Sequence, residues 1–155
     1  QIMVAMPAEH ATKWFGKMPP DLSLISRVRG SDWIYTYLKS FYLDETRPLG
    51  WNNKLFPNAS MPNPLWQLQG MQHAEFSEPD ATGERHVEAL KVTQPGRLNA
   101  AEFDQATRDI TNFLEYAGEP AALKRQSMGV WVILFLAVLT FLFYLLKQEY
   151  WKDVH

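Results

Sequence analysis

The run MGVWVILFLAVLTFLFYLL, residues 128–146, decides the fold class, because it contains no charged residue and a single threonine, Thr140. About 20 apolar residues at a 1.5 Å rise per residue cross the hydrocarbon core of a bilayer. Basic and aromatic residues typical of a membrane interface flank the run: Lys124, Arg125, Lys147, Tyr150, Trp151 and Lys152. The alternative is a buried core helix, but core helices rarely continue this long without a polar residue. The run therefore predicts one C-terminal transmembrane helix.

Composition limits what the rest of the chain can be. The 155 residues suffice for one domain with a hydrophobic core. Lysine and arginine number 15 against 17 acidic residues, and this net charge of −2 argues against nucleic acid as a partner. The sequence has no cysteine, which excludes a disulfide, a thiolate metal site and a thiol nucleophile within it.

Helical spacing is the main signal before the membrane run. The stretch PPDLSLISRVRG, residues 19–30, carries Leu22, Ile25 and Val28 at spacings of three, with Asp21 as a candidate N-cap. Gly30 follows its end, and a second helix is expected from Ser31. The apolar stripe of that second helix is Ile34, Tyr37, Leu38 and Phe41.

The clearest soluble helix is expected over residues 99–117. Asn99 and Glu102 have the spacing of a capping box, and Gly118 and Pro120 stop the pattern. Its predicted buried stripe is Phe103, Ala106, Ile110, Phe113, Leu114 and Ala117. The stretch EALKVTQPGRL, residues 88–98, alternates like a strand and ends in a Pro-Gly turn, which predicts a short hairpin.

Residues 46–70 show no sustained period, only proline, glycine and asparagine between large apolar residues. Such a long, aromatic-rich loop is more typical of a functional segment than of disorder. At its centre, FPNASMPNPLW places Met61 on a rigid, extended stretch. Taken alone, Met61 is either a packing residue or a soft ligand to a metal or haem iron.

Signals for catalysis are weak. His10, His73, His86 and His155 lie far apart and do not have the spacing of zinc ligands on a helix. A glycine-rich phosphate loop and a nucleophile elbow are both missing from the sequence. The residues give no support to a hydrolase.

Three stretches together resemble cytochrome c1, the haem subunit of the cytochrome bc1 complex. They are PPDLSLISRVRGSDWIYTYLKSFY, WNNKLFPNASMPNPLWQLQG and TRDITNFLEYAGEPAALKRQSMG, which leads into the membrane helix. The resemblance covers about residues 19–146 and is closer to the proteobacterial form. It implies a mainly α protein: part of a cytochrome c-like extramembrane domain, a small hairpin and one C-terminal transmembrane helix. The expected boundaries are residues 1–123 for the domain and 124–155 for the anchor and a short cytoplasmic tail.

The resemblance also implies a haem site. Met61 matches the axial methionine of the family, and Arg29 matches the arginine that pairs with a haem propionate, a role suited to a bidentate guanidinium. Trp33 stands where the family usually has an aromatic residue, often tyrosine. The positions expected to line the haem are Pro20, Leu22, Ile25, Trp33, Leu38 and Phe56.

One departure concerns haem attachment. The family binds haem c through Cys-x-x-Cys-His, whose histidine is the second axial ligand, and this sequence has no cysteine. Either the motif lies upstream of Gln1 in a longer subunit, or haem attachment has been lost. The persistence of Met61 and Arg29 favours the first alternative.

The function implied is electron transfer from a Rieske iron–sulfur protein through a Met/His-ligated haem c to a cytochrome c. The subunit is not an enzyme by itself but part of a dimeric quinol:cytochrome c oxidoreductase, in contact with cytochrome b and membrane lipid. Two basic residues flank each end of the membrane run, so orientation rests on the resemblance, which implies a bacterial inner membrane and a periplasmic domain. The rival hypothesis is a haem-free anchored scaffold or docking protein.

Overall fold

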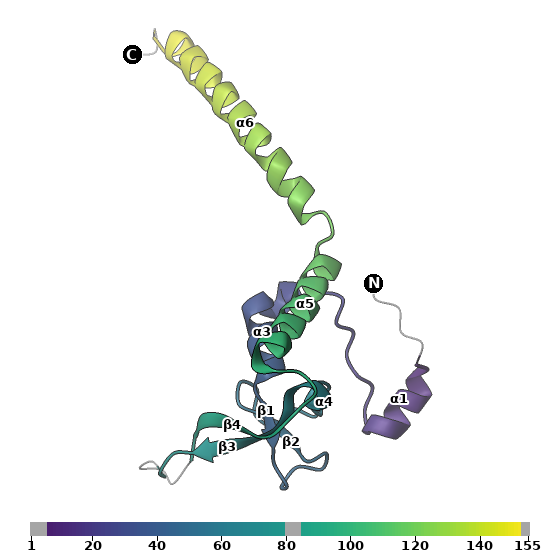
Figure 1. Cartoon of the computed structure of the whole chain (residues 1–155). Coiled ribbons are helices and arrows are strands. Elements are labelled where there is room, and N and C mark those ends of the chain that lie inside the picture. The colour runs from purple at the N-terminus through teal and green to yellow at the C-terminus, as the bar shows by residue number, and fades with distance from the viewer. Residues whose placement is uncertain (1–5, 80–84, 153–155) are drawn as a thin grey trace. The chain divides into compact units, whose positions relative to one another are not determined.

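The computed structural model describes residues 6–79 and 85–152 of the chain (Figure 1). The chain divides into two compact units, Gln1–Gly118 and Glu119–His155. The first contains α1 (Ala8–Phe15), α2 (Ile25–Arg29), α3 (Ser31–Lys39), β1 (Phe41–Leu43), β2 (Trp51–Asn53), α4 (Trp66–Gln69), β3 (Gly70–Phe76), β4 (Val87–Pro95) and α5 (Ala100–Gly118). The second contains α6 (Ala122–Tyr150). The mainly α class with a small hairpin and an apolar C-terminal helix is confirmed.

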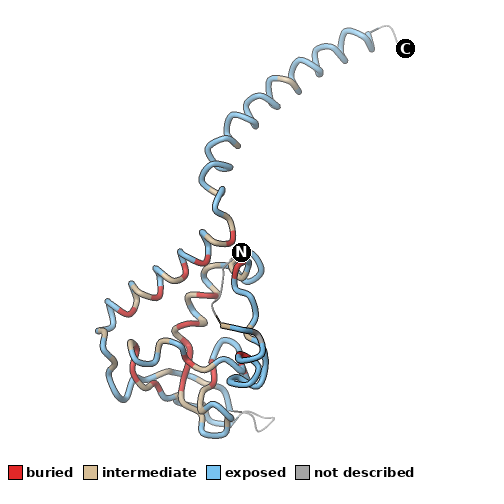
Figure 2. Tube along the Cα trace, turned by 90° about the vertical axis from the view of Figure 1, so that its right-hand side faces the viewer, coloured by how far each residue is buried: buried red, intermediate tan, exposed pale blue. Residues whose placement is uncertain are grey.

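The core of the first unit lies where α3 and α5 pack together. Ile34, Leu38 and Leu114 are its buried centre. Partly buried side chains surround that centre: Ile25, Trp33, Leu65 and Ile110. The trace in Figure 2 accordingly shows buried segments along α3 and α5, with another group around the short strands.

Helix α5 begins with the predicted capping box. The backbone N–H of Glu102 donates to Asn99 Oδ1 at 2.9 Å, and the Asn99 N–H donates to Glu102 Oε2 at 3.0 Å. The predicted buried stripe needs one correction, because Phe113 is 57% exposed. Thr107 and Thr111 are buried instead, since each hydroxyl donates to the carbonyl four residues earlier.

The helix predicted over residues 19–30 is shorter than expected, because α2 begins only at Ile25. Asp21 does not cap it: Asp21 Oδ1 accepts from the Ser23 N–H at 2.8 Å and holds a turn before the helix. Val28 is 74% exposed and lies outside the apolar stripe. Gly30 ends α2 with a φ of 85°, which a residue with a side chain adopts only at a cost.

The two sheets are each a pair of antiparallel strands, within the described residues. The predicted strand is β4, but its partner is β3, on the far side of the acidic stretch SEPDATGERH, residues 77–86. Pro95 and Gly96 therefore end β4 and do not form the hairpin turn. At the base of the hairpin a Cβ on Gly70 would lie 2.1 Å from Gln94 O, and one on Gly96 would lie 2.3 Å from Leu68 O. Only glycine permits this close approach.

Helix α6 has 29 residues and a mean hydropathy of 2.6 over its most apolar window, enough to cross a membrane. At 1.5 Å per residue it is about 43 Å long, more than the ~30 Å hydrocarbon core. The membrane run 128–146 lies inside it. Lys124 and Lys147 lie on α6 on either side of the apolar run, the arrangement typical of residues at a membrane interface.

Candidate functional site

Met61 lies in the segment that joins β2 to α4, hereafter the methionine loop (residues 54–65). Its side chain is 36% exposed, so the thioether is not a core residue. The hydroxyl of Tyr37, on α3, donates to Met61 Sδ at 3.7 Å. Burial raises the pKa of Tyr37 above its usual value, which keeps the phenol protonated and able to donate at neutral pH.

Aromatic rings form a wall beside the sulfur. Trp33 and Tyr37 are four residues apart on α3 and therefore share one side of the helix. Their rings stack, with centroids 4.8 Å apart and planes only 9° apart. Phe56, from the methionine loop, meets Trp33 edge-on at 6.3 Å. These three rings, together with Met61, are called the aromatic face below.

Arg29 lies against the same face. Its guanidinium carbon is 5.1 Å from the centroid of Trp33 and 5.7 Å from that of Phe56, within the range of cation–π contacts. Among the described side chains, no carboxylate lies within ion-pair distance of Arg29. The guanidinium is exposed and carries a positive charge that an anion at the aromatic face would neutralise.

The structure thus brings together four of the residues singled out from the sequence: Arg29, Trp33, Phe56 and Met61. Leu38 is 7% exposed and belongs to the core, against which Ile25 packs. Pro20 and Leu22 lie exposed in the segment before α2. None of these four has a described contact with Met61, so their contact with a haem stays a prediction.

Sequence reasoning missed the contact that Tyr37 makes. The spacing of apolar residues predicts Tyr37 in the buried stripe of its helix, although a residue of that stripe does not need the hydroxyl that tyrosine carries. Tyr37 follows Trp33 by four residues, and the resemblance matches Trp33 to the haem. This spacing could have indicated that Tyr37 lies on the same side of the helix.

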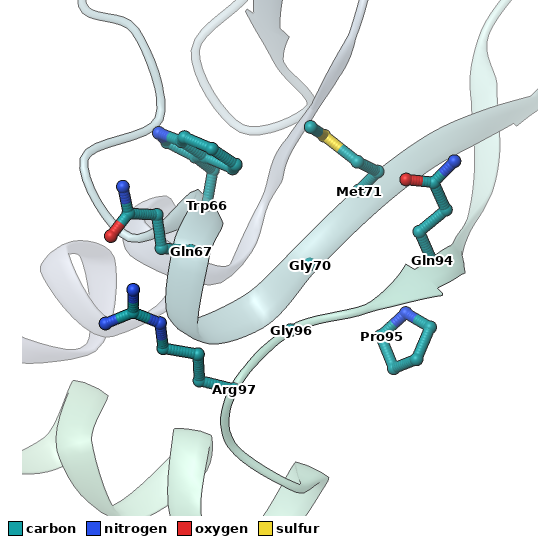
Figure 3. A pocket seen from close by; sticks show the side chains of 8 residues that line it. All are labelled: Trp66, Gln67, Gly70, Met71, Gln94, Pro95, Gly96 and Arg97. Carbon is teal, nitrogen blue, oxygen red and sulfur yellow. The ribbon is translucent and has the colours of Figure 1, made fainter.

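Two hollows elsewhere in the first unit do not contain Met61. One, of about 310 Å³, lies at the base of the hairpin. Figure 3 shows the side chains of Trp66, Met71 and Arg97 around the crossing of Gly70 and Gly96. The other, of about 370 Å³, has Trp14, Lys17, Arg47 and Trp51 among its walls.

The donor set at the site is a thioether and not a group of hard ligands. Among the described residues, no group of three or more histidine, aspartate and glutamate side chains could hold a metal ion. The aromatic face offers one soft ligand, a flat apolar wall and a cation. These properties fit one side of a haem, whose iron accepts a thioether and whose propionates pair with arginine.

Comparison with known proteins relates the chain to cytochromes c1. The profile of the Cytochrome C1 family matches residues 92–154. Cytochrome c1 of Allochromatium vinosum is 54% identical over 99% of this chain and 64% of its own length. Cytochrome c1 of Rhodospirillum rubrum is 31% identical over 90% of this chain and 52% of its own length.

A protein with a different name is also similar. The ammonia monooxygenase gamma subunit of Nitrosomonas europaea is 45% identical over 97% of this chain and 61% of its own length. The chain therefore spans less than two thirds of each of these three relatives. It is similar to cytochromes c1 over nearly its whole length, and the Cytochrome C1 family profile matches its C-terminal part.

Proposed function

We propose that this chain is the C-terminal part of the electron-carrying subunit of a quinol:cytochrome c oxidoreductase of the bc1 type. In this proposal Met61 is an axial ligand of a haem c, and Arg29 binds a propionate. The observation that carries it is the meeting of Met61, Trp33, Phe56 and Arg29 at one exposed face. A packing methionine would not need to be 36% exposed at a face where Arg29 has no carboxylate partner among the described residues.

The second axial ligand and the covalent attachment belong, in this proposal, to a part of the subunit outside the chain. The sequence contains no cysteine, so thioether bonds to haem c require residues that it does not have. Members of the family bind haem c. We therefore place the Cys-x-x-Cys-His motif and its histidine upstream of Gln1.

A bound haem supplies reversible one-electron chemistry, and the residues of this chain adjust the conditions for it. Met61 contributes a neutral sulfur, which favours the reduced iron. Arg29 brings a positive charge, which offsets the negative charge of a propionate. The stacked rings of Trp33 and Tyr37 would exclude water from one side of the haem. The subunit itself makes and breaks no covalent bond.

The partners and the location are part of the same proposal. A Rieske iron–sulfur protein would donate the electron and a cytochrome c would accept it, in a dimeric complex that includes cytochrome b. Residues 1–123 would form the periplasmic domain, and residues 124–155 the anchor in lipid with a short cytoplasmic tail. Helix α6, long and apolar enough to span the bacterial inner membrane, supports the anchor.

Replacement of Met61 by histidine in the full-length subunit tests the ligand. An imidazole favours ferric iron more than a thioether does, so the midpoint potential should fall by about 0.2 V, within the ~0.8 V range of axial ligands. The near-infrared sulfur-to-iron band of the oxidised protein should disappear. A haem held by thioether bonds should stay attached.

Met71→His is the matched control, because Met71 lines the hairpin hollow and has no described contact with the aromatic face. It should leave both the band and the potential unchanged. If Met61→His keeps the band and the wild-type potential, another residue is the ligand and Met61 is a packing residue.

A second candidate function follows from the similarity to the ammonia monooxygenase gamma subunit of Nitrosomonas europaea. In that case the chain would assemble with an oxygenase. Purification of the tagged subunit from its own membranes separates the candidates: cytochrome b and a Rieske protein should copurify with a bc1 subunit. A purified full-length subunit without a Soret band would instead support the haem-free scaffold.

A further inference from the structure

Side-chain amides fill much of the buried polar interior around the methionine loop. Their exposed fractions are 9% or less: Asn52 7%, Asn53 0%, Asn63 2%, Gln69 9% and Gln72 6%. Amides of this kind are usually found at the surface, and burial costs free energy unless each polar atom has a hydrogen-bond partner. Here the partners are backbone groups of the methionine loop, of α3 and of β1, together with side chains: the amides bond to one another, and Asn52 donates to Asp44.

Asn53 attaches the start of the methionine loop to α3. Its Nδ2 donates to the carbonyl of Tyr37 at 2.8 Å. Its Oδ1 accepts from the N–H groups of Leu55 at 2.9 Å and Phe56 at 3.1 Å. One fully buried side chain therefore fixes the backbone of Phe56 to the helix that carries the other two rings of the aromatic face.

Asn63 attaches the end of the loop, two residues after Met61. Its Oδ1 accepts from the Leu65 N–H at 2.9 Å, and its Nδ2 donates to Gln69 Oε1 at 2.9 Å. Gln69 Nε2 in turn donates to the carbonyl of Lys39 at 3.3 Å. This second attachment also ends on α3, through one intermediate side chain.

Both attachments use the same property of α3. The last carbonyls of a helix have no partner inside it, and Tyr37 and Lys39 lie in the last turn of α3. Asn53 and Gln69 satisfy these carbonyls with side-chain donors. Met61 therefore lies between two amide attachments that end on the turn carrying Tyr37.

We propose that Asn53 and Asn63 are positioning residues for Met61: they hold its sulfur at the aromatic face so that it stays on the iron. This inference rests on the proposed function of Met61 as an axial ligand. An amide suits the task because it donates and accepts at once. Alanine removes both functions: at position 53 the N–H groups of Leu55 and Phe56 lose their acceptor, and at position 63 the Leu65 N–H and Gln69 Oε1 lose their partner.

The experiment uses the full-length subunit in its membrane complex and imidazole as the probe. Imidazole binds ferric haem only after the methionine has left, so its binding rate reports opening of the loop. Asn53→Ala and Asn63→Ala should each raise that rate about 10- to 100-fold, the range expected when a buried group loses its partner. The sulfur-to-iron band of the oxidised variants should be weaker than in the wild type.

Phe103→Ala is the matched control, because it removes a buried side chain of α5 outside the cluster of Ile34, Leu38 and Leu114 and has no described contact with the loop. It should leave the binding rate unchanged. Because Asn53 is fully buried and its variant can fail to fold, Asn63→Ala alone decides in that case.

The outcomes separate the inference from the proposed function. The inference is overturned if the asparagine variants bind imidazole at the wild-type rate, or if Phe103→Ala accelerates binding equally. A wild-type protein without the band, or one in which Met61→His changes nothing, overturns the proposed ligand itself.

Discussion

Replacement of Tyr37 by phenylalanine removes the hydroxyl that donates to Met61 and leaves a ring able to stack on Trp33. In the proposed haem protein the hydrogen bond withdraws electron density from the sulfur, which weakens its donation to ferric iron. Loss of the bond should therefore stabilise the oxidised state. The midpoint potential of Tyr37→Phe should be lower than that of the wild type.

The size of the shift follows from the bond. A neutral hydrogen bond contributes about 0.5–1.5 kcal/mol net. For one electron, 1.4 kcal/mol corresponds to about 59 mV, so complete loss in one oxidation state gives about 20–60 mV. Sulfur is a weak acceptor and the Oη–Sδ distance is 3.7 Å, so the lower part of this range, about 20–40 mV, is expected.

The assay is a redox titration of the haem absorbance in the full-length subunit. Tyr35→Phe is the matched control, because Tyr35 lies on the same helix but its hydroxyl donates to Asp104 and not to Met61. The control should keep the wild-type potential. If both variants shift equally, or if Tyr37→Phe does not shift, the hydroxyl does not act on the sulfur.

Three further predictions concern the anchor, the hairpin and acid stability. Deletion of the residues after Lys124 should move the protein from the membrane to the aqueous fraction, because α6 carries the apolar run; sedimentation after a high-salt wash would contradict this. In urea unfolding, Gly30→Ala should cost about 1–3 kcal/mol, the strain of a backbone conformation that essentially only glycine adopts, without a clash. Gly70→Ala, with a Cβ 2.1 Å from a carbonyl oxygen, should cost more, and equal costs would count against the predicted clash. The Lys39 ammonium lowers the pKa of Asp104 from 3.8 to about 2, so the extra stability of the wild type over Asp104→Asn should be present above pH 4 and vanish by about pH 2; a difference that does not change with pH would refute it.

Local signals predicted the elements that depend on neighbours in sequence. The capping box at Asn99, the end of α2 at Gly30 and the apolar run of α6 each require only residues a few positions apart. Apolar periodicity predicted the wrong buried residue where a polar side chain has a hydrogen-bond partner within its own helix. Thr111 is buried on α5 because its hydroxyl donates to Thr107 O, whereas Phe113 points away from the core.

Sequence patterns could not predict contacts between residues that are far apart in the sequence. The strand that pairs with β4 is separated from it by the acidic stretch, so alternation identified the strand but not its partner. The asparagines of residues 46–70 are interpreted from the sequence as turn residues, which is their common role. Nothing local shows that Asn53 reaches the carbonyl of Tyr37, 16 residues earlier. The resemblance identified Met61 and Arg29 as site residues. The structure shows that Asn53 and Asn63 attach the loop of Met61 and that Arg29 lies over Trp33.

Helix α3 explains why the site depends on the core although Met61 is exposed. Ile34 and Leu38 on one side of the helix are buried against Leu114, while Trp33 and Tyr37 carry the aromatic face. Backbone carbonyls in the last turn of the same nine-residue helix accept the hydrogen bonds that attach the methionine loop. A helix this short is not stable alone in water, so its position is set by the core beneath it. The distance from Tyr37 to Met61 is therefore fixed through one rigid element, because the ring, the loop attachments and the buried side chains all share α3.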